Sequence, residues 1–152
     1  MKRRNNRQDA IREIVRGKSI RTQRALVQEL EDAGYTCTQA TVSRDIADMG
    51  LRKLPEGIYV LAEDLHLQHM VSELVQRVDC ADNLVLIKAQ PGTAPGIAAA
   101  IDAADLPNIV GSLAGNDTIL VVAATHKDGA DFAALVNTLR TAHESQAVLL
   151  DM

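Results

Sequence analysis

Hydrophobic residues in the first sixty positions recur at the three- and four-residue spacing of amphipathic helices. The first group predicts a helix that ends at Gly17; its apolar face consists of Ile11, Ile14 and Val15. A second helix is expected to begin after Thr22, whose hydroxyl is placed to cap it, and to stop at Gly34. Its apolar face consists of Leu26, Leu30 and Ala33.

A third helix is predicted over Gln39–Met49, with Gly50 as its stop. Its narrow apolar stripe consists of Val42, Ile46 and Met49, and the residues that point away from this stripe are Ala40, Ser43, Arg44 and Ala47. Between Leu51 and Leu61, two short runs broken by Pro55-Glu56-Gly57 predict a small hairpin. Helices and a hairpin in this order are typical of a winged helix-turn-helix. The alternative is a plain three-helix bundle whose Ser, Thr and Arg side chains are solvated.

The second half mixes strand and helix patterns. Asn108–Leu113 and Thr118–Ala124 predict two strands joined by the turn Ala114–Asp117. An Ala-rich helix is expected after Pro91-Gly92-Thr93, with Ile97, Ile101 and Ala104 on one face, and a final helix is marked by Phe132, Leu135, Val136 and Leu139. Ala147–Leu150 is expected to form one further short strand. The stretch that ends at Val78 is ambiguous, because its Val71, Leu74, Val75 and Val78 also suit a helix.

Composition narrows the class of protein. Of the 152 residues, 47% are hydrophobic, which is enough for a folded core and excludes wholesale disorder. Aromatic residues make up only 2%, which argues against a binder of single-stranded nucleic acid. The longest apolar run, Ile119–Ala124, is too short to span a membrane, and polar residues follow the basic start where a signal peptide would be apolar. Cys37 and Cys80 give no disulfide framework, so a cytoplasmic protein is expected.

The net charge of −4 is unevenly distributed along the chain. Through Leu61, twelve basic residues against eight acidic ones give +4, whereas the remainder carries −8. This asymmetry predicts two domains with different partners, residues 1–61 and 70–152, joined by a linker over 62–69 that begins with the polar Ala62-Glu63-Asp64. The basic domain could attract phosphate, an anionic membrane surface or only water.

The outward face of the third helix carries short hydrogen-bonding groups and one arginine. Such a face fits the major groove of DNA, where Arg44 would take a guanine edge and Gln39 an adenine edge. The candidate DNA-binding residues are Gln39, Thr41, Ser43 and Arg44 on this helix, with Gln23 and Arg24 on the preceding one.

At these positions the chain resembles the bacterial arginine repressor family. The matching segments are Ile20-Arg21-Thr22-Gln23, Gly34-Tyr35, the unbroken string from Thr38 to Ile46, Gly50-Leu51 and Gly57-Ile58-Tyr59. The resemblance implies that Ser43 and Arg44 are the DNA-binding signature of the recognition helix and that the partner is double-stranded operator DNA.

A second group of candidate residues surrounds the start of the Ala-rich helix. Gly92-Thr93-Ala94 is expected to present free backbone N–H groups, which suit a carboxylate. Asp102 lies about two turns along the same helix, and Asp117 lies in the later turn. A basic amino acid needs such donors for its carboxylate and such carboxylates for its cations. The alternative is that Asp102 is surface charge and Asp117 a turn former.

The resemblance extends through this half. The matching residues are Gly92-Thr93-Ala94, Asp102, Gly111–Gly115 and Asp117–Ile119. It implies that the later part of the ambiguous stretch is a strand, which pairs with Leu84–Ala89 across a turn at Cys80–Asn83. The order of elements then describes a small α+β domain with two helices on one face of an antiparallel sheet. It also implies a homohexamer built as a dimer of trimers, with L-arginine between the trimers as co-repressor and no other cofactor. Small residues of the Ala-rich helix suit close subunit packing: Ala94, Ala98, Ala99, Ala100, Ala103 and Ala104.

Asn116 departs from the family pattern, in which two consecutive Asp follow the glycine. The first Asp is the expected partner of the guanidinium, and an amide loses that bidentate ion pair. Three consequences are open: weaker arginine binding with Asp117 partly substituting, a shift towards a neutral analogue such as citrulline, or a hexamer that no longer needs ligand. Pro95 is a smaller departure, where some relatives carry a polar side chain. The candidate ligand-binding residues are Gly92, Thr93, Ala94, Asp102, Asn116 and Asp117.

The sequence therefore predicts an arginine-responsive transcriptional repressor that binds palindromic operators of arginine metabolism genes as a hexamer. Alternatives are a repressor-like protein with an altered or lost effector response, and an amino-acid-binding scaffold without a role on DNA. An enzyme is not expected, because motifs such as Gly-x-Ser-x-Gly and His-Glu-x-x-His are missing from the sequence. His66 and His69 lack companion ligands nearby, so no metal site is expected, and the shortness of the apolar runs means that no membrane role is expected either.

Overall fold

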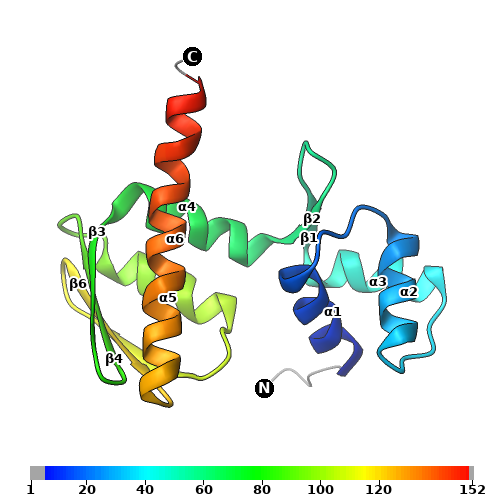
Figure 1. Cartoon of the computed structure of the whole chain (residues 1–152), viewed down its shortest axis with the longest axis horizontal. Helices are drawn as coiled ribbons and strands as arrows, with labels where there is room; N and C mark the ends of the chain where they lie inside the picture. Colours follow the sequence, from blue (N-terminus) through cyan, green and yellow to red (C-terminus); the bar gives the residue numbers. More distant parts are fainter. Residues whose placement is uncertain (1–5, 151–152) are drawn as a thin grey trace. The chain divides into compact units, whose positions relative to one another are not determined.

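The computed structural model of the chain describes residues 6–150, and their side chains as far as residue 141. Lys2, Arg3 and Arg4, which contribute to the basic charge of the first half, lie outside the described residues. The chain divides between Ala62 and Glu63 into two compact units (Figure 1). Each unit has its own hydrophobic core.

The first unit consists of three helices and a two-stranded hairpin, as the sequence predicts. Its elements are α1 (Asn6–Gly17), α2 (Gln23–Asp32), α3 (Gln39–Met49), β1 (Leu51–Lys53) and β2 (Tyr59–Leu61) (Figure 1). Thr22 and Thr38 cap α2 and α3, accepting hydrogen bonds from backbone N–H groups at 3.0 Å and 3.2 Å. Each such cap contributes about 1 kcal/mol to helix stability. Gly50 ends α3 in the left-handed conformation, with φ +67°, where a side chain would be strained.

The core of the first unit lies between the three helices and the hairpin. Its buried residues are Ile11, Val15, Ile20, Leu26, Leu30, Val42, Leu51 and Leu61. On α3 only Val42 of the expected apolar stripe is fully buried, whereas Ile46 and Met49 are half-buried at the edge of this core. The Tyr59 N–H donates to the Ile20 carbonyl at 2.8 Å, which ties the hairpin to the loop between α1 and α2.

The second unit is a four-stranded antiparallel sheet with helices on one face, so the α+β prediction is confirmed. Its elements are α4 (Ala62–Leu74, which begins at the junction), β3 (Val75–Ala81), β4 (Leu84–Ala89), α5 (Ala94–Ala104), β5 (Ile109–Ala114), β6 (Thr118–Ala123) and α6 (His126–Leu150). The strand order is β3-β4-β6-β5, and every neighbouring pair is antiparallel. Alternate residues of β4 and β6 are buried against α5 and α6: Val85, Ile87, Ile119 and Val121 meet Ile97, Ile101, Phe132 and Val136.

Two segments differ from the sequence-based expectation. Residues 62–69, expected to be a linker, form the first part of α4, and Leu67 is buried in the core of the second unit. Glu63 and Asp64 lie in the first turn of α4, where negative charge favours a helix. The expected strand over Ala147–Leu150 is wrong, because α6 continues to Leu150. A four-residue apolar run does not distinguish strand from helix, and no glycine or proline follows Gly129 to end α6.

Gly129, in the first turns of α6, touches the turn between β3 and β4. A Cβ at this position would lie 2.8 Å from the Asp82 carbonyl oxygen and 3.2 Å from the Asn83 Cα. We expect Gly129→Ala to lower the free energy of unfolding by about 1–3 kcal/mol, because backbone must shift and the gain in helix propensity is smaller. Urea denaturation measures the change, with Gly111→Ala as control, because the space around Gly111 is open. Equal losses in the two variants would contradict this close packing.

Candidate functional site

The outward face of α3 presents the residues expected to read DNA. Gln39, Ser43 and Arg44 are exposed, while Thr41 is half-buried and its hydroxyl lies 2.9 Å from that of the capping Thr38. On the first turn of α2, Arg24 is exposed and Gln23 is half-buried. The structure therefore places these candidates on two consecutive helices of one unit, with the arginines in solvent.

A buried ion pair that the sequence analysis missed holds α3 to α1. The side chain of Asp45 is 4% exposed and receives two hydrogen bonds from the Arg7 guanidinium, one of them at 3.1 Å. Gln8 donates a third bond at 3.2 Å. The hydrogen bonds from Arg7 hold the pKa of Asp45 below its ordinary value, against the opposing effect of burial. The clue in the sequence is that Asp45 lies three residues after Val42, on the buried stripe, where a carboxylate needs a partner.

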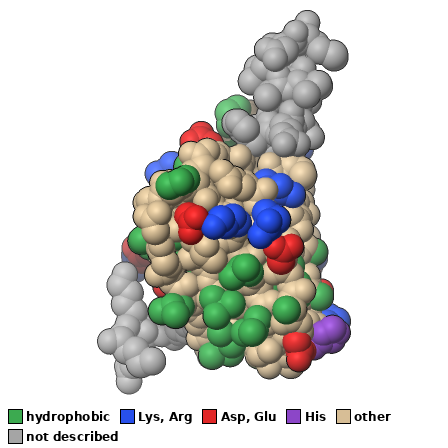
Figure 2. All heavy atoms as spheres, turned by 90° about the vertical axis from the view of Figure 1, so that its left-hand side faces the viewer, with side chains coloured by type: hydrophobic (Ala, Val, Ile, Leu, Met, Phe, Trp, Pro, Cys, Tyr) green, Lys and Arg blue, Asp and Glu red, His purple; other side chains and the backbone are tan. Residues whose placement is uncertain are grey.

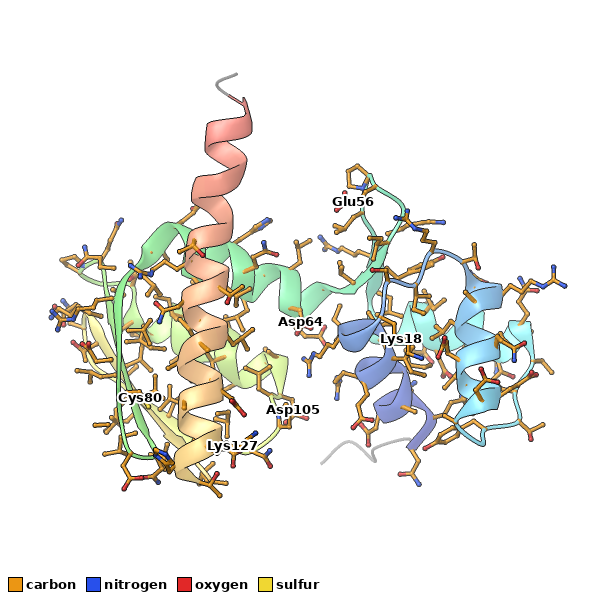
Figure 3. All side chains as sticks on the ribbon, viewed as in Figure 1. Lys18, Glu56, Asp64, Cys80, Asp105 and Lys127 are labelled. Atoms are coloured by element: carbon orange, nitrogen blue, oxygen red, sulfur yellow. The ribbon has the colours of Figure 1, made fainter. Side chains whose placement is uncertain are left out.

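The hairpin of the first unit carries cations and is fixed by side chains around its turn. The Arg21 guanidinium donates to the carbonyl of Glu56 at 2.7 Å, and Glu56 lies at the hairpin tip (Figure 3). The Lys53 ammonium lies 5.3 Å from the centre of the Tyr59 ring, a cation–π contact. Arg52 and Lys53 are exposed on β1. The hairpin therefore adds positive charge to the unit that carries the exposed face of α3.

In the second unit, two of the predicted ligand-binding segments are brought together at the start of α5. The Ala94 N–H donates to the Asn116 carbonyl at 3.2 Å, and the Ala89 N–H donates to the Asp117 carbonyl at 2.8 Å. The first bond joins Gly92–Ala94 to the turn between β5 and β6, and the second joins the end of β4 to the same turn. The expectation that the N–H groups of Thr93 and Ala94 are free is wrong, since that of Thr93 donates to the Gln90 carbonyl at 3.2 Å. A ligand carboxylate at this place would compete with carbonyls of the chain itself.

Asp117 is already engaged by an ion pair. Its Oδ2 lies 2.6 Å from the Lys88 ammonium, and its Oδ1 accepts a hydrogen bond from the Thr118 hydroxyl at 2.9 Å. The bonds from Lys88 and then Thr118 hold the pKa of Asp117 below its ordinary value. The neighbouring Asn116 side chain is exposed and has no hydrogen-bond partner among the residues whose side chains are described. Lys88 was missed by the sequence analysis, because strand pairing rather than sequence spacing places it beside Asp117.

Asp102 is not brought to the other predicted ligand residues within one chain. It lies eight residues after Ala94, about 12 Å along α5, on the exposed side of that helix. There Asp102 accepts a hydrogen bond from the Ser112 hydroxyl at 3.4 Å and borders a hollow of ≈ 190 Å³ next to β5. Asp102 and Asp117 thus occupy separate places on the surface of the second unit.

Metal-binding and membrane-spanning features are not found in the part of the chain that the structure describes. There, no three His, Cys, Asp or Glu side chains gather as metal ligands would, His66 and His69 included. Within residues 6–150 no helix combines the length and the apolar character needed to cross a membrane.

Comparison with known proteins also divides the chain into two parts. Residues 2–67 match the family model of the arginine repressor DNA-binding domain, and residues 71–138 match that of the arginine repressor C-terminal domain. The arginine repressor of Carboxydothermus hydrogenoformans is 42% identical over 128 residues, which cover 77% of this chain and 85% of that protein. The arginine repressor of Solibacter usitatus is 43% identical over 120 residues, covering 77% and 83%. That of Thermus thermophilus is 46% identical over 132 residues, covering 80% of each. These matches, which together cover both units, show that the chain belongs to the arginine repressor family.

Proposed function

We propose that the protein is a transcriptional repressor that binds palindromic operators of arginine metabolism genes in the cytoplasm and responds to L-arginine. The observation that carries this proposal is the exposed face of α3, where Arg44 lies in solvent while the adjacent, buried Asp45 fixes the helix to Arg7. A helix that presents short polar groups and one arginine fits the major groove, where arginine binds a guanine edge through two hydrogen bonds. A regulator of this kind performs no catalysis.

The exposed hairpin and α2 supply the contacts to the DNA backbone. Arg24 on α2 and the β1 residues Arg52 and Lys53 are exposed cations on the same unit as Arg44. Contacts of this kind set the register on the duplex and make the affinity fall steeply with salt, because bound phosphates release counterions. Two such units on a palindromic operator would read half-sites about one helical turn apart.

The second unit has the surface expected of an assembling domain. On the outer face of the sheet, Leu86 lies opposite Leu120, which lies opposite Leu113, so apolar side chains form a row across three strands. Val110 and Leu113 are 71% and 73% exposed. Figure 2 shows hydrophobic side chains gathered on this side of the second unit, below a row of charged ones. An exposed apolar face of this kind supports assembly into trimers.

The exposed side of α5 suits the contact between two trimers. Of its small residues, Ala99 and Ala103 are exposed beside Asp102, whereas Ala94, Ala98, Ala100 and Ala104 are buried in the core of the chain. Small side chains permit close approach, and an opposing subunit would bring its own Asp102 towards the Asp117 turn. This arrangement supports an arginine site shared between subunits in a dimer of trimers. Binding of arginine and of operator would then strengthen each other by the same factor.

Replacing Asn116 with Asp should strengthen arginine binding. The Asn116 side chain is exposed and only its backbone carbonyl is used by the fold, so the substitution adds a carboxylate without breaking a contact. The new carboxylate gives the guanidinium a charge-assisted bidentate pair, so we expect the affinity for arginine to rise about tenfold. The affinity for citrulline should not rise, because its side chain carries no charge. Calorimetric titration with arginine, lysine, ornithine and citrulline measures both. A wild-type protein that binds arginine as tightly as Asn116→Asp would show that the amide costs nothing.

The experiment that tests the proposed function is a gel-shift assay on an arginine biosynthesis promoter, with and without arginine and citrulline. We expect a specific complex whose affinity rises with arginine. A complex that rises only with citrulline, or that forms equally without ligand, would establish the altered effector response that Asn116 allows. Failure to bind the promoter under every condition, with amino acid still bound, would instead identify the protein as a ligand-binding scaffold.

A further inference from the structure

Lys88 pairs with Asp117, which carries the only carboxylate among the described turn residues 115–118. Its Nζ lies 2.6 Å from Asp117 Oδ2, and the second carboxylate oxygen accepts from Thr118 at 2.9 Å. Lys88 on β4 is paired in register with Thr118 on β6, so the sheet fixes the base of the lysine side chain. The Ala89 N–H holds the Asp117 carbonyl at 2.8 Å, which fixes the other partner. Both groups are therefore presented to each other by rigid backbone.

Among the described residues, Asp117 is the carboxylate that forms an ion pair with Lys88. The cross-strand neighbour of Lys88 on β3 is Arg77, a second cation, and the Arg77 guanidinium pairs with Asp79 at 2.8 Å. Asp117 is therefore the acid that balances Lys88. The two side chains are 39% and 36% exposed, so a ligand can reach the pair from solvent. Exposed ion pairs of this kind shift an equilibrium by no more than about fivefold, which makes the lysine displaceable.

We propose that Lys88 is an internal competitor for the effector: it occupies the Asp117 carboxylate in the ligand-free chain, and a cationic ligand must displace it to bind. This inference rests on the proposed function, because it concerns the same ligand site. The cost of displacing Lys88 is the same for every ligand that uses Asp117. Lys88 therefore raises the ligand concentration needed for a response without choosing between arginine and lysine. A ligand whose side chain is neutral leaves the pair intact and does not meet this cost.

Calorimetric titration of the full-length protein with arginine, lysine and citrulline tests this role of Lys88. In Lys88→Gln we expect arginine and lysine to bind about two- to fivefold more tightly, by equal factors, with citrulline unchanged. Lys88→Arg keeps a cation beside Asp117 and should bind arginine no more tightly than wild type. Lys127→Gln is the control for net charge, because Lys127, in the first turn of α6 (Figure 3), pairs with the exposed Asp131.

The outcomes separate the inference from the proposed function. If wild type binds arginine and Lys88→Gln binds it equally or more weakly, the internal competitor is overturned while the effector role stands. An equal gain in Lys127→Gln, or a gain for citrulline, also overturns the inference, because the effect would not come from the Asp117 pair. If no variant binds arginine, the proposed effector fails and the inference fails with it. Binding seen only in Lys88→Gln would support the competitor and contradict an arginine response in the wild-type chain.

Discussion

Arg44→Ala should remove specific operator binding while leaving the assembly of the protein intact. Arg44 is exposed on the outward face of α3 and has no ion-pair partner among the described residues, so its loss breaks no ion pair of the fold. A bidentate contact between arginine and guanine contributes about 1–3 kcal/mol of base discrimination. Because a palindromic operator has two half-sites, the loss of binding free energy on the operator should be twice this value. Fluorescence anisotropy on operator and on scrambled DNA measures the change, and size-exclusion chromatography measures the assembly.

A second variant, at a cation proposed to contact phosphate, distinguishes base reading from general attraction to DNA. Arg24→Ala on α2 should weaken operator and scrambled DNA about equally and reduce the salt dependence, since phosphate contacts carry no sequence information. Arg44→Ala should retain the salt-dependent binding to scrambled DNA. Specific operator binding that survives in Arg44→Ala would show that α3 is not the helix that reads the bases.

Asp45→Asn should destabilise the first unit by about 3 kcal/mol, more than any surface substitution. Asp45 is 3% exposed, and its carboxylate accepts hydrogen bonds from Arg7 and Gln8. The substitution therefore leaves the Arg7 guanidinium without its buried counter-charge. Breaking one side of a buried pair costs about 3–5 kcal/mol, and the partial exposure of Arg7 reduces this somewhat. Urea denaturation followed by circular dichroism measures the loss. The matched control is Glu29→Gln, which breaks the exposed pair with Lys18 (2.6 Å) and should cost less than about 1 kcal/mol.

The same pair gives a pH dependence with a definite sign. The pKa of Asp45 is lower in the folded chain than in the unfolded one, chiefly because of the hydrogen bonds from Arg7. Its contribution is therefore complete above the unfolded pKa of about 3.9 and is lost as the pH falls through the lower folded pKa. Wild type should lose this stability in the acid range below about pH 4, and Asp45→Asn should lack that part of the loss. Parallel acid titrations of the two proteins would contradict the assignment.

Short-range features of the fold are predictable from the sequence. Thr22 caps α2 and Gly50 ends α3 as the sequence predicts, because caps depend on neighbouring residues along the chain. The expected strand at Ala147–Leu150 is wrong, and residues 62–69, expected to be a linker, begin the helix α4. Short apolar or polar runs do not by themselves fix a conformation, which at α4 is decided by the burial of Leu67 in a distant core.

The interactions that complete the site join residues that are far apart in the sequence. Arg7 and Asp45 are separated by 38 positions, and Lys88 and Asp117 by 29. Each partner is an ordinary charged residue in its own segment, so no local pattern distinguishes a buried or competing ion pair from a solvated charge. The candidates on α3 and in the Asp117 turn were identified from local chemistry and from resemblance. Their assignment as binding residues stays a prediction, for which the titrations and DNA-binding assays described above are the tests.

The backbone and the side chain of Asn116 have different environments. Its backbone carbonyl joins the turn to the start of α5, while its side chain extends into solvent. Selection can therefore exchange this side chain freely, since the fold depends on an atom that every amino acid has. A regulator built in this way can acquire a new metabolite signal by one substitution while its DNA target stays the same. Libraries at position 116 would accordingly be a direct route to biosensors for other amino acids.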